Sequence, residues 1–185
     1  MALDASKVRV AVTGAVMSGL TSAAAPTGTA AATTGFTDLG YVNEDGVTIT
    51  TPESGDTTPI KAWQNGATVR TIRAATEDNP TVSFVLLETK KESVEAALGV
   101  TITQTVTEGS FEIDTTDVAA AKSWIVDVVD GAELIRAYVP QGTPTGGLEL
   151  VFKNDEPIGY SVTLDCERNN TAGYNLKVWA TALKS

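Results

Sequence analysis

Residue types that carry out chemistry are scarce in this chain. Its 185 residues include no histidine, the commonest general base and the commonest metal ligand in proteins. Cys166 is the only cysteine, so thiolates cannot assemble a zinc or iron–sulfur site. Neither a nucleophile-elbow sequence nor a phosphate-binding glycine loop is present. We therefore expect no enzyme activity, no cofactor and no metal.

Carboxylates are the remaining side chains that could act as general acids or bases. Asp114 with Asp117, and Asp127 with Asp130, are nominal acid–base pairs for glycoside hydrolysis. Both pairs fall at expected strand ends or turns, where acidic residues are usually solvated. The Asn-Glu-Asp run at 43–45 offers oxygen ligands but lacks the alternating spacing of a calcium loop, so a turn is expected there.

The three tryptophans, Trp63, Trp124 and Trp179, could form a carbohydrate-binding platform if they were exposed together. All three fall in expected strands, which favours packing in a core or an interface. Cys166 also lies in an alternating strand and is expected to be buried and inert.

The charge of the chain restricts the kinds of partner that it can bind. The sequence holds 13 basic and 23 acidic residues, a formal net charge of −10. Binding nucleic acid through its phosphates needs a basic surface, which this composition does not offer. No apolar run of about 18 residues predicts a membrane span, and the first residues lack the apolar centre of a signal peptide. We expect folding in a reducing cytoplasm.

Hydrophobic alternation predicts a single, mainly β domain over 1–185, a twisted β-sandwich or partly open barrel. Turn signals at Asn65-Gly66 and Asp130-Gly131 predict two hairpins, the second with a type I′ turn. The strands are expected over 7–12, 47–51, 60–63, 68–74, 81–87, 103–113, 124–129, 132–139, 148–152, 157–166 and 174–183.

One short α-helix is predicted over 90–98. Thr89 is the expected N-cap, and Glu92 three residues later completes a capping box. Apolar side chains at helical spacing form one face, and Gly99 occupies the position where a left-handed residue ends a helix.

The stretch 13–37 is built almost entirely of alanine, threonine, glycine and serine. Such small residues bury little area, so the stretch is expected to be a flexible loop or arm that orders against a neighbouring subunit. A disordered linker is the alternative. The residues expected to make the inter-subunit contact are Thr13, Met17, Leu20, Pro26 and Phe36.

Residues from about 40 to 99 resemble the major tail protein, or tail tube protein, of long non-contractile-tailed phages. The resemblance begins in Gly-Tyr-Val-Asn-Glu-Asp-Gly-Val at 40–47 and continues through Ile-Lys-Ala-Trp-Gln-Asn-Gly at 60–66. It ends with the predicted helix. The motif residues that carry it are Gly46, Ile60, Trp63, Gln64, Arg70 and Glu88.

The resemblance implies a structural virion protein located in the phage tail and assembled in the bacterial host cytoplasm. Subunits of such families form hexameric rings around a lumen, and the rings stack around a tape measure protein. Terminator and tail-tip proteins close the two ends, and genomic DNA later passes through the lumen. No membrane is involved.

An acidic lumen would repel phosphate and keep DNA from sticking. On this hypothesis some of the chain's acidic residues line the lumen. The candidates are Glu44, Asp45, Glu53, Asp56, Glu77, Asp78, Glu108 and Glu112.

Three other functions stay open at this point. The chain could be a tube subunit of a tail-related secretion or contractile machine. It could be a virion decoration protein or a carbohydrate- or receptor-binding β-sandwich module. A carboxylate-dependent hydrolase is the third possibility, and it would need a cleft with two close carboxylates.

Overall fold

The structure, a computed structural model, describes residues 4, 7–31, 33–53, 55–74, 78–114, 118–145, 150 and 152–184. Within them it confirms a mainly β fold with one α-helix. The elements are β1 (Thr13–Gly19), β2 (Phe36–Asp38), β3 (Val42–Thr50), β4 (Thr57–Lys61), β5 (Thr68–Arg73), β6 (Thr81–Leu86), α1 (Lys91–Leu98), β7 (Thr103–Gln104), β8 (Gly109–Ser110), β9 (Lys122–Asp130), β10 (Glu133–Pro144), β11 (Tyr160–Cys166), β12 (Lys177–Ala180) and a 3-10 turn, η2 (Thr181–Leu183).

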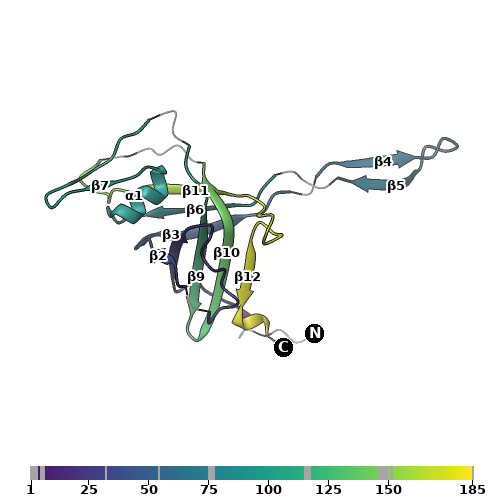
Figure 1. Ribbon diagram of the computed structural model, residues 1–185. Coiled ribbons are helices and arrows are strands. Elements are labelled where there is room, and N and C mark those ends of the chain that lie inside the picture. The colour runs from purple at the N-terminus through teal and green to yellow at the C-terminus, as the bar shows by residue number, and fades with distance from the viewer. Residues whose placement is uncertain are drawn as a thin grey trace.

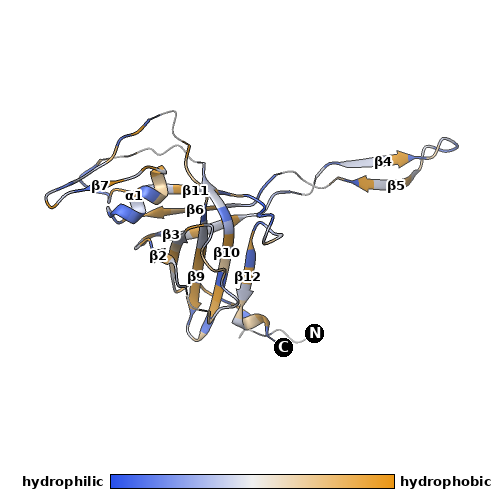
Figure 2. Ribbon diagram, viewed as in Figure 1, coloured by the Kyte–Doolittle hydropathy of each residue, from blue (hydrophilic) through white to orange (hydrophobic). Residues whose placement is uncertain are grey.

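Eight strands form one antiparallel sheet in the order β2-β1-β9-β10-β11-β6-β3, with β12 also paired to β10. The sheet does not close into a barrel, because β2 and β3 end it without pairing to each other. In Figure 1, β3, β6 and β11 cross β9, β10 and β12, and the core lies between these two groups. Hydrophobic residues run along β6, β9 and β11 (Figure 2).

Strand β11 has the alternation that the sequence predicted. Tyr160, Val162, Leu164 and Cys166 are buried, whereas the residues between them are more exposed. Strand β6 alternates in the same way and pairs with β11 over its whole length. The two strands therefore give the core a continuous apolar face.

Strand β10 joins the two layers by changing partners along its length. Residues Ile135 to Tyr138 pair with β12, and Gly142 to Pro144 pair with β11. The pairing with β9 shifts register between Val139 and Gly142. A bulge of this kind bends a strand and increases its twist, which carries β10 from one layer to the other.

Side chains of β9 donate hydrogen bonds to backbone carbonyls of this bulge. The Ser123 hydroxyl donates to the carbonyl of Pro140 at 2.8 Å, and the Trp124 indole Nε1–H donates to the carbonyl of Gly142 at 2.9 Å. Both side chains are fully buried. A Cβ at Gly142 would lie 2.8 Å from Trp124 Cδ1, so only glycine lets the indole approach this closely.

The turn between β9 and β10 differs in detail from the prediction. Asp130 pairs with Glu133, so the two loop residues are Gly131 and Ala132 rather than Asp130 and Gly131. Gly131 has a φ of 60°, and no described non-glycine residue has a positive φ. A positive φ at the first loop position alone is the pattern of a type II′ turn, not type I′.

The helix begins at Lys91 and ends before Gly99, whose φ of 67° confirms the predicted left-handed cap. The predicted capping box is wrong. Lys90 is the N-cap, and it makes no side-chain capping bond, since its ammonium group has no acceptor. The Thr89 hydroxyl, the expected cap, hydrogen-bonds the Tyr160 hydroxyl at 2.9 Å. No helix among the described residues is long and apolar enough to cross a membrane.

The stretch 13–37 differs from the expected flexible loop at both ends. It begins with β1, which pairs with β9 over seven residues, and ends in β2. Small residues favour this strand, since a Cβ at Gly14 would collide with the Asp127 carbonyl. Val16, in the middle of β1, is buried in the core.

A buried arginine holds the loop between β1 and β2. Arg136 and Asp127 face each other across β10 and β9, and their side chains form a two-point ion pair at 2.7 and 2.6 Å. The guanidinium also donates to the carbonyls of Ala31 at 2.7 Å and Gly28 at 3.3 Å. The hydrogen bonds to Asp127 raise the pKa of Arg136, so it stays charged.

Other predicted strands are shorter or absent. Residues 7–12 form no strand, although Val12 donates to the Val129 carbonyl at 3.2 Å. The strand expected over 103–113 is reduced to the two-residue strands β7 and β8, and that over 174–183 to β12. Most of the strand expected over 148–152 lies outside the described residues.

Removing the Arg136 side chain should destabilise the fold, because it leaves the Asp127 carboxylate buried without a partner. We expect Arg136→Ala to lower the free energy of unfolding by about 3 kcal/mol. Denaturant titration followed by tryptophan fluorescence measures the change. Arg168→Ala, at an exposed position, is the control and should change stability little. A loss below about 1 kcal/mol would contradict the importance of this pair.

The Cys166 thiol should be inert in the folded protein. Burial, with the nearby Asp165 charge, raises its pKa from 9.0 to about 12. The folded state therefore holds the proton more tightly, and this contribution to stability is lost as pH rises from 9.0 towards 12. We expect no reaction with a thiol reagent at about pH 8 until denaturant is added. Rapid labelling of native protein would contradict the assignment.

Candidate functional site: the projecting hairpin

Strands β4 and β5 form a separate two-stranded sheet that projects from the body (Figure 1). Its loop confirms the predicted Asn65-Gly66 turn. The amide of Ala67 donates to the Asn65 side chain at 3.0 Å, and Gly66, with a φ of 69°, donates to the Ala62 carbonyl at 2.9 Å. We call residues 57–74 the hairpin.

The hairpin carries large apolar side chains that nothing in the subunit covers. Trp63, in the end loop, is 96% exposed, and Val69 is 66% exposed. Ile60 and Ile72 are also exposed and share one face, since Ile60 pairs with Arg70 and Ile72 with Thr58. An isolated two-stranded hairpin is marginally stable in water. This one therefore has the properties of a contact element that is completed by a partner.

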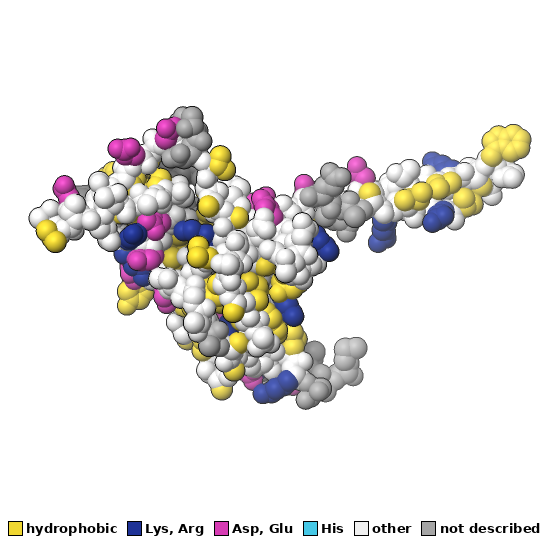
Figure 3. Space-filling model, in the orientation of Figure 1, with side chains coloured by type: hydrophobic (Ala, Val, Ile, Leu, Met, Phe, Trp, Pro, Cys, Tyr) yellow, Lys and Arg dark blue, Asp and Glu magenta, His cyan; other side chains and the backbone are white. Residues whose placement is uncertain are grey.

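The hairpin also differs from the rest of the chain in charge. Lys61, Arg70 and Arg73 lie in it, and it contains no acidic residue. It therefore carries +3, while the remainder of the chain carries −13 out of the total of −10. Figure 3 shows its basic side chains on the stalk, with apolar side chains along the stalk and at the tip. A surface complementary to the hairpin would be apolar and acidic.

Four of the six motif residues, Ile60, Trp63, Gln64 and Arg70, lie in the hairpin. Gly46 lies in β3 with a φ of 70°, where the pairing with β6 shifts register. The motif therefore concentrates on the exposed hairpin rather than on the core.

Glu88, the sixth motif residue, organises the chain before β3. Its carboxylate accepts the Tyr41 amide at 2.9 Å and pairs with Lys90 at 3.5 Å. Gly40, with a φ of 87°, leaves room for this carboxylate, because a Cβ there would collide with it. The role of Glu88 in this structure is thus the positioning of the segment that leads into β3.

The five expected arm residues do not form one exposed surface. Leu20 and Thr13 are exposed, but Met17 is half-buried in β1 and Pro26 is buried. Phe36 is half-buried in β2 and packs edge-on against the Tyr138 ring, with 6.3 Å between centroids. Met17, Pro26 and Phe36 thus pack on their own subunit, and only Thr13 and Leu20 of the five are exposed.

The acidic residues proposed for a lumen fall in three places. Glu44 and Asp45 lie at the start of β3, whereas Glu53, Asp56 and Asp78 lie near the base of the hairpin. Glu108 and Glu112 belong to the segment around β7 and β8, on the opposite side of Figure 1 from the hairpin. Glu77 lies outside the described residues.

The nominal catalytic carboxylates have structural roles. Asp127 is engaged by Arg136, and Asp130 accepts the Val10 amide at 3.3 Å and lies 3.7 Å from Arg9. Asp114 makes an interaction of its own, and Asp117 is outside the described residues.

The turn expected for the Asn-Glu-Asp run is wrong, because these residues lie within β3, where the pairing with β6 shifts register. The Asp45 amide donates to the Asn43 side chain at 2.5 Å. No cluster of acidic residues or cysteine suited to a metal is found among the described residues.

The tryptophans do not form a platform. Trp124 is in the core, as expected, and Trp63 is at the tip of the hairpin. Trp179 is half-buried on β12, where the Lys177 ammonium lies 5.0 Å from the centre of its ring. The three side chains thus occupy three separate environments.

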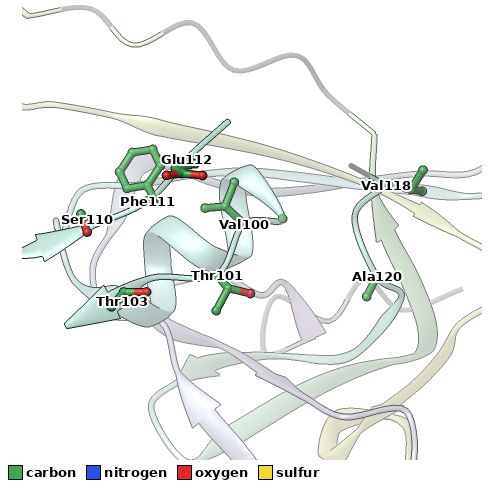
Figure 4. Close-up of a pocket in the computed structure, with 9 residues that line it drawn as sticks. Val100, Thr101, Thr103, Ser110, Phe111, Glu112, Val118 and Ala120 are labelled. Carbon is green, nitrogen blue, oxygen red and sulfur yellow. The ribbon is translucent and has the colours of Figure 1, made fainter. Parts of the chain in front are cut away.

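An open pocket of about 610 Å³ lies between the segment after α1 and the chain around β8. Figure 4 shows Val100 and Thr101 in its middle, Phe111 and Glu112 on one side and Val118 on the other. Glu112 is the only charged side chain in its described lining, so no pair of carboxylates faces this space.

The family model for phage tail tube proteins matches residues 1–181 of the chain. The match thus includes the hairpin, both layers of the sheet and the helix. No curated protein matches the chain.

Because no hairpin side chain is buried, we expect the body to fold without it. Replacing 57–73 by a short Gly-Ser linker should change the free energy of unfolding by less than about 0.5 kcal/mol. Val162→Ala, in the core, is the positive control and should cost about 2 kcal/mol. Denaturant titration measures both variants. A large loss on hairpin replacement would show that the hairpin stabilises its own subunit.

Proposed function

Because the chain belongs to the phage tail tube protein family, and is therefore a structural component of the phage tail, we propose that its copies join through the hairpin into stacked rings. The hairpin is the observation that carries this proposal. It exposes Trp63, Ile60 and Ile72 on an element that has no covering layer of its own. Apolar ribbons of this kind are stabilised when another subunit covers them.

The proposed tube belongs to a long non-contractile tail. Six subunits form each ring, and rings stack around a tape measure protein between terminator and tail-tip proteins. The subunits fold and assemble in the bacterial host cytoplasm. Support for the tube rests on the family match over residues 1–181 together with the open ends of the sheet at β2 and β3.

Genomic DNA passes through the lumen of this tube without binding to it. Support comes from the charge of the chain outside the hairpin, which would repel phosphates. We propose that one or more of the three acidic groups around Glu44, Glu53 and Glu108 line the path of the DNA.

Electron microscopy of the purified protein, beside size-exclusion chromatography over a concentration series, tests the assembly. We expect rings or hollow tubes, if necessary after addition of tail-tip and tape measure proteins. Trp63→Ser should abolish them without changing thermal stability, since the side chain is 96% exposed. Trp63→Phe keeps an aromatic ring and should retain assembly. A protein that stays monomeric with every tail component present would overturn the proposal.

Charge reversal of one acidic group at a time tests the DNA path. The three variants replace Glu44 and Asp45, then Glu53, Asp56 and Asp78, then Glu108 and Glu112, by lysine. We expect at least one variant to assemble normally and to slow DNA ejection from virions, because lysines attract phosphate. Unchanged ejection in all assembled variants would exclude these residues from the lumen.

A further inference from the structure

A groove of about 380 Å³ runs between β1 and the start of β3, and its floor reaches the hydrophobic core. We call it the β1–β3 seam. Its floor includes Val16 and Val126, which belong to the core, and half-buried Val47. Val12 and Tyr41 stand at its rim, and Tyr41 is 76% exposed.

The seam exists because the two layers of the sandwich separate there. β1 is held to β9 by backbone pairing, and the first residues of β3 leave β6, since Val42 pairs with Leu86 but the next paired residue is Val47. The four residues between them bulge outward, helped by the positive φ of Gly46. The seam is therefore built from fixed backbone rather than from a loop that could close over it.

The size and lining of the seam suit one large apolar side chain. Its volume lies in the range of about 300–1,000 Å³ typical of clefts that enclose ligands. In the described lining Glu44 and Asp127 are the only charged side chains, and Asp127 is neutralised by Arg136. Glu44 is exposed at the rim and leaves one negative charge beside an apolar floor.

The hairpin carries the two features that complement the seam, which are a large apolar side chain and a nearby positive charge. Trp63 is the largest exposed apolar side chain of the chain, and Lys61 lies two residues before it. Lys61 is the last residue of β4, and Trp63 follows it in the end loop. That spacing allows an indole on the floor of a groove and an ammonium group at its rim.

The two surfaces lie at opposite ends of β3. The seam is lined by residues 42–47 at the beginning of the strand, and the hairpin follows its end at Thr50. A hairpin can therefore leave one subunit on the side away from that subunit's own seam and reach the seam of the next.

We propose that Trp63 of one copy inserts into the β1–β3 seam of a second copy, with Lys61 facing Glu44 across the rim. This inference rests on the proposed function and assigns the receiving surface of the hairpin. It places Glu44 at a contact between subunits, which leaves the groups around Glu53 and Glu108 as the candidates for the path of the DNA. The seam is then the surface that receives Trp63 in each contact between neighbouring subunits. The inserted side chain covers the described core where it opens to the groove beside β1.

The groove between α1 and β7–β8, at about 490 Å³, is a poorer acceptor. Its described lining includes Lys90, Lys91 and Glu92, so it lacks the net negative charge that would attract the basic hairpin. The seam therefore matches the hairpin better in the sign of its charge, whereas the two grooves are similar in apolar character.

Site-specific cross-linking tests the contact. Gln64→Cys labels the hairpin tip beside Trp63, and Thr13→Cys labels the exposed rim of the seam. The two proteins are mixed, assembled and treated with a short bismaleimide at about pH 7, where buried Cys166 does not react. We expect cross-linked dimers that contain one copy of each variant. Gln64→Cys mixed with Arg168→Cys, at an exposed site outside the seam, should give at least tenfold less product.

Charge exchange tests the same contact independently. Glu44→Lys and Lys61→Glu should each raise the protein concentration needed for assembly about tenfold, because each places like charges at the rim. The double variant restores opposite charges and should assemble near the wild-type concentration. Asp155→Lys, an exposed change elsewhere, is the control.

The outcomes separate this inference from the proposed function. Assembled tubes that cross-link through Arg168 and not through Thr13, or a double variant with no recovery, would overturn the seam as acceptor and leave the tube intact. A wild-type protein that never assembles would overturn both. Cross-linking through Thr13 together with recovery in the double variant would establish the contact.

Discussion

The two-layer fold depends on a few hydrogen bonds at the bulge of β10. A strand that passes from one layer to the other leaves carbonyl groups without strand partners, and unpaired buried carbonyls are costly. Ser123 and Trp124 on β9 supply the two missing donors and fill the space at the corner. With the corner fixed, β12 and β11 occupy successive stretches of the same edge of β10, and the core forms between the layers they extend.

A second constraint acts on the other side of the same strand pair. The Arg136 guanidinium joins Asp127 to carbonyls at Gly28 and Ala31, so a stretch with little apolar area is ordered by charge and hydrogen bonds. The loop between β1 and β2 is thereby held against β9 and β10, whereas the hairpin stands apart from the body. Buried charge and hydrogen bonds thus order one part of the domain, whereas the hairpin has no buried side chain.

Local sequence patterns predicted the parts of the fold that depend on hydrophobic periodicity and on local backbone geometry. The alternation of β11, the Asn65-Gly66 turn and the cap at Gly99 follow from periodicity and backbone geometry, and all three are present. Strand β1 was missed because its stability comes from pairing with β9 and from close backbone approach at Gly14, neither of which leaves a hydrophobic signature. The seam could not be predicted, since it brings together three segments distant in sequence.

The charge of the hairpin also restricts the symmetry of any assembly. A twofold contact that placed hairpin against hairpin would bring together two surfaces that each carry +3 without a compensating acid. That repulsion disfavours isologous pairs formed through the hairpins alone, and favours contacts of each hairpin with a different surface of its neighbour. The same three cations act as gatekeepers for an apolar ribbon while the subunit is still alone. The same positive charges thus oppose aggregation of free subunits and disfavour contacts between two hairpins.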